Sequence, residues 1–128
     1  LDLDPENMTA SAHLGTLALE ARHFKKAGEL LEKVARTDSK NEAAQFNFAR
    51  ASLALKEFAK AEKILENLTQ SKSRNPMVFL NYAESLIGQN KDSSKARQAI
   101  NKAKILSNDK DFNERCDWTL KKIEGKTD

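Results

Sequence analysis

The sequence repeats itself at a period of about 34 residues, and this periodicity constrains the fold more than any other feature. Leu14, Phe48 and Tyr82 follow one another at this interval, and each is followed by a small residue. Further positions align in the same register without a gap: Phe24 with Phe58, Ala27 with Ala61, Leu31 with Leu65, and Val34 with Leu68. A fixed period of this length is typical of stacked modules that pack against their neighbours. We therefore predict a short array of repeats.

Each repeat is predicted to contain two helices. In the second repeat, apolar residues recur at helical spacing, namely Phe58, Ala61, Ile64, Leu65 and Leu68. The chain has only 4 Gly and 2 Pro, too few turn-forming residues for the many short strands of a sandwich or barrel. Because the linkers near residues 22–23, 56–57 and 90–94 are short, the two helices of a repeat must run antiparallel. The sequence thus predicts an all-α superhelical solenoid of helical hairpins.

These hairpins resemble the tetratricopeptide repeat, whose signature combines Leu-Gly in the first helix with Ala-x-x-x-Phe in the second. The matching segments are Leu14-Gly15 with Ala27-x-x-x-Leu31, Phe48-Ala49 with Ala61-x-x-x-Leu65, and Phe79-x-x-Tyr82-Ala83-x-x-Leu86 with Ala96-x-x-x-Ile100. The sequence departs from the family pattern at Ser11, Gln45, Ala18 and Ser52, and at Ser39 and Ser73 in place of the closing proline. The resemblance covers residues 8–110 and implies the fold of this family.

The repeat boundaries follow from the same register. We predict repeats over residues 8–41, 42–75 and 76–110, the third with one extra residue in its turn. Residues 1–7 look like the closing segment of a preceding repeat, with Pro5 where the family places its proline, so we expect the chain to be part of a longer protein. Residues 111–128 are predicted to form a C-terminal capping helix and a polar tail. The apolar residues of this helix are Phe112, Cys116, Leu120 and Ile123.

No pattern in the sequence predicts catalysis, a cofactor site or a metal site. Gly125-Lys126-Thr127 lacks the upstream glycine and the preceding strand of a phosphate-binding loop. His13 and His23 lie far from other candidate ligands, and a surface position is the preferred interpretation of both. Cys116, the only cysteine, is expected to pack as a small apolar residue under the last helix. We therefore predict that the chain is not an enzyme.

The charge pattern gives a weak case for nucleic acid. The chain has 22 Lys and Arg against 19 Asp and Glu. A basic stretch on the third hairpin could meet an acidic partner or a phosphate backbone, and consists of Lys91, Lys95, Arg97, Lys102 and Lys104. A solvated helix face is the preferred interpretation, because no aromatic residues are interleaved with these charges. No run approaches the roughly 18 apolar residues that cross a bilayer, so membrane insertion is not expected.

The concave groove of such a solenoid is where a partner is expected to bind, because the first helix of each hairpin lines it. The face opposite Phe48 and Ala49 gives the candidate peptide-groove residues, which are His13, Phe46, Asn47, Arg50, Met77, Leu80, Asn81 and Glu84. His13, Asn47 and Asn81 are predicted to form a ladder, in which an Asn amide can donate to and accept from a peptide backbone. Two alternatives to peptide binding remain. One is that the polar residues are simply tolerated on a solvent-exposed helix face, and the other is that another segment of the protein covers the apolar groove residues.

One specific ligand can be tested against the sequence. Family members that hold the acidic C-terminal tails of cytosolic heat-shock chaperones carry a two-carboxylate clamp of Lys, Asn, Asn, Lys and Arg. The corresponding positions here are Ala12, Thr16, Asn47, Met77 and Asn81, of which only Asn47 matches. Because the three cations are missing, a free carboxylate would lose its charge-assisted hydrogen bonds. Tight binding of such tails is therefore not predicted.

Two functions are consistent with the sequence. The first is a protein-interaction module in which the asparagines bind backbone, Arg50 and Glu84 select charge, and the apolar groove residues form a pocket for an extended or helical segment. The second is an architectural spacer or a self-association surface within a larger scaffold. A third, in which the segment is the regulatory arm of an enzyme, depends on parts of the protein outside this sequence. The compartment is not indicated.

Overall fold

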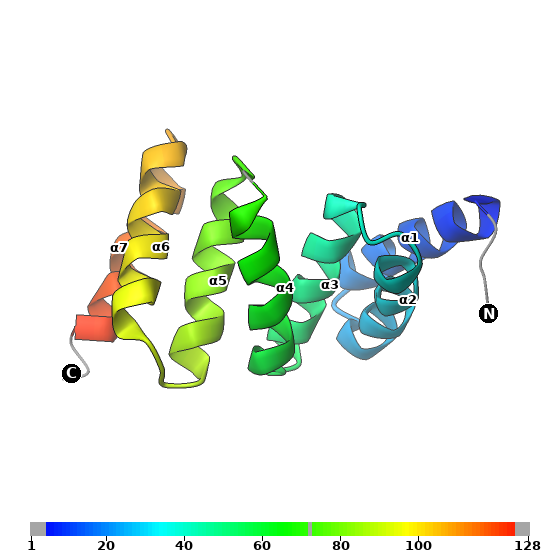
Figure 1. Ribbon diagram of the computed structural model, residues 1–128, viewed down its shortest axis with the longest axis horizontal. Coiled ribbons are helices and arrows are strands. Elements are labelled where there is room, and N and C mark those ends of the chain that lie inside the picture. The colour runs from blue at the N-terminus through cyan, green and yellow to red at the C-terminus, as the bar shows by residue number, and fades with distance from the viewer. Residues whose placement is uncertain (1–4, 72, 125–128) are drawn as a thin grey trace. The chain divides into compact units, whose positions relative to one another are not determined.

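The structure is a computed structural model that describes residues 5–71 and 73–124 of the 128-residue chain. These ranges contain seven α-helices and no strand (Figure 1). The helices are α1 (Pro5–Glu20), α2 (Phe24–Thr37), α3 (Glu42–Ala54), α4 (Phe58–Gln70), α5 (Pro76–Gly88), α6 (Ser93–Leu106) and α7 (Lys110–Glu124). The predicted capping helix corresponds to α7, and the polar tail, residues 125–128, lies outside the described residues.

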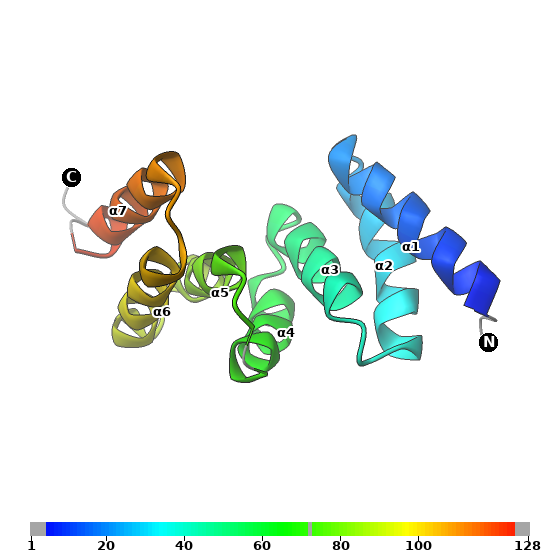
Figure 2. The same ribbon diagram turned by 90° about the horizontal axis from the view of Figure 1, so that it is seen from above.

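The chain divides into two compact units, residues 1–64 and residues 65–128, and the boundary falls within α4. In the first unit, α1 and α2 form an antiparallel hairpin, and α3 contacts both of them (Figure 1). In the second unit, α5 and α6 form a hairpin, and α7 packs mainly on α6 with a smaller contact to α5 (Figure 2). The short linkers thus produce the predicted hairpins in each unit.

Asparagine and aspartate side chains cap the first turns of four helices, the fourth being α7, where Asp109 Oδ1 accepts from the Asp111 and Phe112 N–H groups. The Asn41 Oδ1 atom accepts a hydrogen bond from the Ala44 N–H at 3.0 Å, and Asn75 Oδ1 accepts from the Met77 N–H at the same distance. Asp92 caps α6 in the same way. These caps satisfy backbone donors that have no partner within the helix. The first repeat differs, because α1 already begins at Pro5, within the segment that was expected to close a preceding repeat.

The turn inside each hairpin places a residue in the left-handed region at the same repeat position, and the third turn has a second such residue, Asp92. Arg22, Lys56 and Asn90 have φ values of 67°, 62° and 56°, and they follow one another at the 34-residue interval. After each of them, the next backbone N–H bonds back to a carbonyl five residues earlier, as from Glu57 to Ser52 at 2.8 Å. This hydrogen-bond pattern is that of a Schellman C-cap, which usually places glycine at the left-handed position. None of the three turns uses glycine.

The core of the first unit lies among α1, α2 and α3. Leu31 of α2 is fully buried in a cluster with Leu19 of α1 and Phe48 of α3. Phe24 and Ile64 pack against its edge. Because Gly15 has no side chain, α1 can approach Leu31 closely, as the alternation of small and large residues predicts.

The core of the second unit is built from α5, α6 and α7. Leu80, Leu86 and Ile100 are essentially inaccessible to solvent, and so is Cys116 of α7. Since Cys116 and Ile123 are buried where α7 packs on α6, the last helix covers the apolar side of the α5–α6 hairpin.

The large residue of the first repeat behaves differently from its two equivalents. Phe48 and Tyr82 are buried, whereas Leu14 is 54% exposed. Leu17, one helical turn later, is 47% exposed. In the described part of the chain, no helix packs on this side of α1 in the way that α2 packs on α3. The side therefore remains an open apolar surface.

Candidate functional site

Four of the predicted groove residues lie in the first unit, on the first helices of two successive hairpins. His13 of α1 and Arg50 of α3 are exposed, and Phe46 and Asn47 are partly buried. We call the surface formed by these four residues the α1/α3 face. Since α1 and α3 contact each other directly, both helices can present side chains to one ligand.

Arg50 is held by two neighbours on the same helix. Its guanidinium carbon lies 5.8 Å from the centre of the Phe46 ring, and its Nη1 atom donates to Asn47 Oδ1 at 3.3 Å. The cation–π contact and the hydrogen bond together limit the conformations of a long side chain. Asn47 keeps its two amide protons for another acceptor. The α1/α3 face therefore presents an aromatic ring, a cation and an amide donor within two turns of helix.

The other four candidates lie in the second unit, where the structure differs from the expectation at two of them. Leu80 is fully buried and Asn81 is only 4% exposed, so neither side chain faces an open surface. In this unit both α6 and α7 pack on α5, which leaves less of its surface open than a hairpin alone would. Met77 and Glu84 remain partly accessible. A continuous amide ladder from His13 through Asn47 to Asn81 is thus not available to a ligand in this state.

Glu84 is joined to the last helix by an ion pair. Arg115 Nη2 of α7 lies 3.0 Å from Glu84 Oε2 and donates a hydrogen bond to it. Both side chains are partly exposed, so the pair contributes well under about 1 kcal/mol to stability. Its greater effect is to orient the Glu84 carboxylate toward α7.

The sequence reasoning missed Trp118 of α7, which is 58% exposed. Its position follows Glu84 by 34 residues, just as Glu84 follows Arg50. Lys122 Nζ lies 4.0 Å from the centre of the Trp118 ring, and Arg115 lies one turn earlier on the same helix. Extending the repeat register by one more interval would have identified this residue. An exposed Trp beside cations is a common feature of protein-binding surfaces.

Comparisons with known proteins agree with the all-α fold. The family profile described as tetratricopeptide repeat matches residues 18–79, which includes both helices of the second predicted repeat. Residues 18–79 are thus assigned to the tetratricopeptide repeat. No match was found among the curated proteins.

Solved structures of several proteins superpose on almost the whole chain. PcrH from Pseudomonas aeruginosa is 13% identical with a TM-score of 0.80, and 96% of each chain is covered. The Yersinia enterocolitica type III secretion chaperone SycD, in complex with a peptide of the translocator YopD, is 15% identical with a TM-score of 0.80 and 98% coverage of both chains. The first TPR of Spaghetti, bound to the HSP90 peptide SRMEEVD, is 18% identical with a TM-score of 0.78; 97% of this chain and 95% of that one are covered. These similarities confirm the predicted fold class, an all-α solenoid of helical hairpins.

Few other groups in the described residues suggest a chemical function. In the described residues, no group of three or more His, Cys, Asp and Glu side chains is arranged to hold a metal ion. Burial raises the pKa of the Cys116 thiol, and the neighbouring Asp117 carboxylate raises it further. Such a thiol is a poor nucleophile at neutral pH. No helix within the described ranges has the length and apolar character needed to cross a membrane.

Proposed function

We propose that this chain is a non-catalytic interaction module that binds a peptide or a helix of a partner protein on the first-helix surfaces of its repeats. The observation that carries the proposal is the α1/α3 face, where Phe46, Asn47 and Arg50 form a connected group. Because Arg50 is already held by its neighbours, less conformational entropy is lost when a ligand binds. The Phe46 ring offers apolar contact, Arg50 selects a negative charge, and the Asn47 amide donates to a backbone carbonyl.

The second unit has a candidate surface of its own, made by a different set of residues. Trp118, with Lys122 over its ring, is the large exposed anchor on α7, and Met77 and Glu84 lie on α5. Leu80 and Asn81 are assigned to the support of this surface, because both are buried. Rigid aromatic side chains contribute much of the energy of protein interfaces.

Two structural relatives support a peptide ligand. SycD is described in complex with a translocator peptide, and the first TPR of Spaghetti with an HSP90 peptide. At 15% and 18% identity, the likeness itself extends to the fold alone. The proposal for this chain rests on that fold together with the side chains of the α1/α3 face.

Selection from a phage-displayed random peptide library tests the proposal. We expect peptides that bind the wild-type chain and lose at least about tenfold in affinity with Phe46→Ala or Arg50→Gln, which corresponds to about 1.4 kcal/mol. Lys33→Gln is the matched control, because it removes one exposed positive charge from α2. All variants are checked for helix content by circular dichroism. Selection of no peptide, or equal binding by all variants, would contradict the proposal.

The second candidate function, self-association or stacking within a scaffold, is favoured by one observation. Leu14 and Leu17 form an open apolar strip on α1, at positions equivalent to residues of α3 that are buried. Sedimentation across a range of concentrations tests this function with Leu14→Glu. Concentration-dependent dimers that Leu14→Glu abolishes and Phe46→Glu leaves intact would support it. Dimers that depend on Phe46 instead would place self-association on the α1/α3 face.

A further inference from the structure

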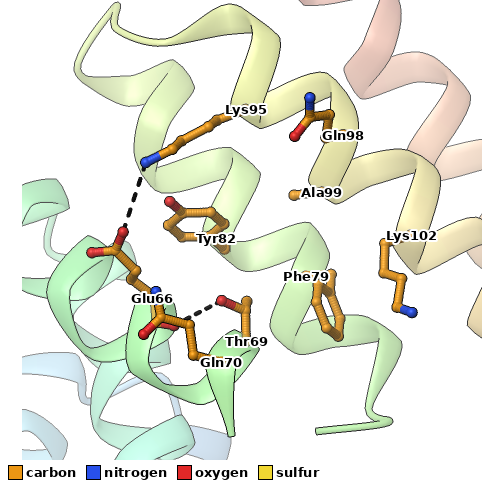
Figure 3. A pocket seen from close by; sticks show the side chains of 9 residues that line it. All are labelled: Glu66, Thr69, Gln70, Phe79, Tyr82, Lys95, Gln98, Ala99 and Lys102. Carbon is orange, nitrogen blue, oxygen red and sulfur yellow. Dashed lines mark hydrogen bonds and ion pairs between the residues drawn. The ribbon is translucent and has the colours of Figure 1, made fainter. Parts of the chain in front are cut away.

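A pocket lies in the second unit, on a side of α5 that faces away from Glu84 and α7. Phe79 and Tyr82 of α5 form its floor, and the side chains of α4 and α6 form its two walls (Figure 3). Its volume is about 290 Å³. This is close to the lower end of the range for ligand pockets, about 300 Å³, and suits a single large side chain better than a cofactor.

The α6 wall of the pocket has a short side chain at its centre. Ala99 stands between Lys95 and Lys102, so this part of the wall is a single methyl group, and the Phe79 and Tyr82 side chains that line the pocket keep 8% and 7% of their surface exposed (Figure 3). On the opposite wall, the Thr69 hydroxyl donates to the Glu66 carbonyl at 2.7 Å, so its proton is already in use. The floor is therefore apolar, and most of the polar groups lie at the rim.

The cations of α6 are divided between two sides of the helix. Arg97 and Lys104 point to α7, where they pair with Glu124 at 3.8 Å and with Asp117 at 2.5 Å. Lys95 and Lys102 line the pocket. The basic stretch seen in the sequence is thus partly neutralised by the last helix, and its remaining charge is directed into one pocket.

The two ends of the pocket differ in charge. At one end, Lys95 Nζ lies 3.8 Å from the Glu66 carboxylate, which compensates it. At the other end, Lys102 lies beside Phe79, and the facing residue of α4 is the neutral Gln70 (Figure 3). Among the described residues, Lys102 has no ion pair. The pocket therefore combines an aromatic floor with one uncompensated cation.

We propose that this pocket binds an acidic peptide segment of a partner protein, in which a carboxylate neighbours an aromatic or large aliphatic side chain. The apolar side chain packs on Phe79 and Tyr82, and the carboxylate pairs with Lys102. Charge complementarity favours this ligand, because the lining residues carry two positive charges and one negative charge. A nucleic-acid strand is disfavoured, since its phosphates would approach Glu66 and most other cations of α6 are paired. The site is separate from the α1/α3 face.

The test is an NMR titration of the ¹⁵N-labelled full chain with the capped tripeptide acetyl-Asp-Phe-Glu-amide. We expect a dissociation constant of roughly 1 mM, because one anchor and one charge pair supply little energy. The amide signals of Thr69, Gln98 and Ala99 should shift, and those of the α1/α3 face should not. The neutral peptide acetyl-Asn-Phe-Gln-amide and the truncated peptide acetyl-Asp-Ala-Glu-amide should each bind at least about threefold more weakly.

Variants on one helix separate the pocket from general electrostatics. Lys102→Gln should weaken binding at least about threefold, whereas Lys104→Gln, which removes the same charge from the side that faces α7, should leave it unchanged. Ala99→Leu should also weaken binding by filling the pocket, without any change in charge. The backbone spectra show whether each variant is folded.

Several outcomes would overturn the proposal. One is the absence of shifts around the pocket when the peptide concentration is 10-fold above the expected dissociation constant of about 1 mM. A second is an equal loss of affinity with Lys102→Gln and Lys104→Gln. Another is tighter binding of a single-stranded RNA hexanucleotide to the same residues, which would assign the pocket to nucleic acid.

Discussion

Gly15 lies so close to Leu31 that a β-carbon at Gly15 would stand 2.7 Å from Leu31 Cγ. Leu31 is fully buried, and its branch point cannot move aside without disturbing the cluster around it. The close approach of α1 and α2 at this position therefore depends on the absence of a side chain.

This contact predicts opposite effects for two helix glycines. Gly15→Ala should lower the free energy of unfolding by about 1 kcal/mol or more, because overpacking outweighs the gain in helix propensity. Gly28→Ala should raise it by about 0.5–1 kcal/mol, since a β-carbon there would lie 3.7 Å from the nearest Leu55 atom, an ordinary contact. Urea denaturation of the two variants measures both changes. A stabilising Gly15→Ala substitution would show that Leu31 can shift at little cost.

The turn at Lys56 offers a way to stabilise the protein. Its φ of 62° is costly for a residue with a side chain and costs glycine nothing. Lys56→Gly should therefore raise the free energy of unfolding by about 1 kcal/mol. Lys56→Ala is the control, because it removes the same side chain and keeps the β-carbon. If both variants gain equally in urea denaturation, the gain comes from loss of the lysine charge and not from relief of strain.

Truncation of the large residue at one repeat position should affect stability differently in the first and second repeats. Phe48→Ala should lower the free energy of unfolding by about 3–5 kcal/mol, because Phe48 is buried in the cluster around Leu31. Leu14→Ala should lower it by less than about 1 kcal/mol, since Leu14 is 54% exposed. Thermal and urea denaturation of the two variants give the comparison. A large loss at Leu14 would show that its side of α1 is covered in solution, as by a second copy.

The period of the sequence was sufficient to predict the helices but not what covers them. Leu14, Phe48 and Tyr82 occupy one register position, which predicts a common direction on the helix. Whether that direction is buried depends on the neighbouring helix, and only the latter two have one. The same reason explains Leu80 and Asn81, which were predicted to line a groove and are buried in a unit where α7 contacts α5.

Trp118 shows a different limit of prediction from the repeat motif. The register that relates Arg50 to Glu84 also reaches Trp118, but α7 lacks the small residue that accompanies the large one in the earlier repeats. Asp117 stands in that place and pairs with Lys104. Since no second helix of a hairpin follows α7 within the described residues, a small residue is not needed there. The motif thus disappears although the helix keeps its register.

Burial of Cys116 should make stability depend on pH in the alkaline range. Its pKa is raised in the folded state, chiefly by desolvation, so the unfolded chain loses this proton first. The contribution of Cys116 is fully present below about pH 8.5, the pKa of an unperturbed thiol, and is lost as pH rises above it. Urea denaturation between pH 7 and pH 10 should show a steeper loss for the wild type than for Cys116→Ala. Equal slopes would mean that the thiol titrates normally in the folded protein.

The chain should bind heat-shock chaperone tails only weakly, although a relative of similar fold is described with such a peptide. Of the five positions that correspond to the family's carboxylate clamp, only Asn47 matches, and its Oδ1 atom accepts from Arg50. Arg50 is a single cation, and one exposed charge pair contributes at most about 1 kcal/mol. Calorimetry with the peptide SRMEEVD should therefore give a dissociation constant above about 100 μM.

The first TPR of Spaghetti is the positive control for this measurement, because it is described with the same peptide. A peptide in which both acidic side chains are amidated and the C-terminus is blocked tests whether any weak binding depends on charge. Arg50→Gln should remove what remains. A low-micromolar dissociation constant for the wild-type chain would instead mean that another set of cations binds the carboxylates. Because Arg115 and Lys122 flank Trp118 on α7, those two side chains would then be the first to replace.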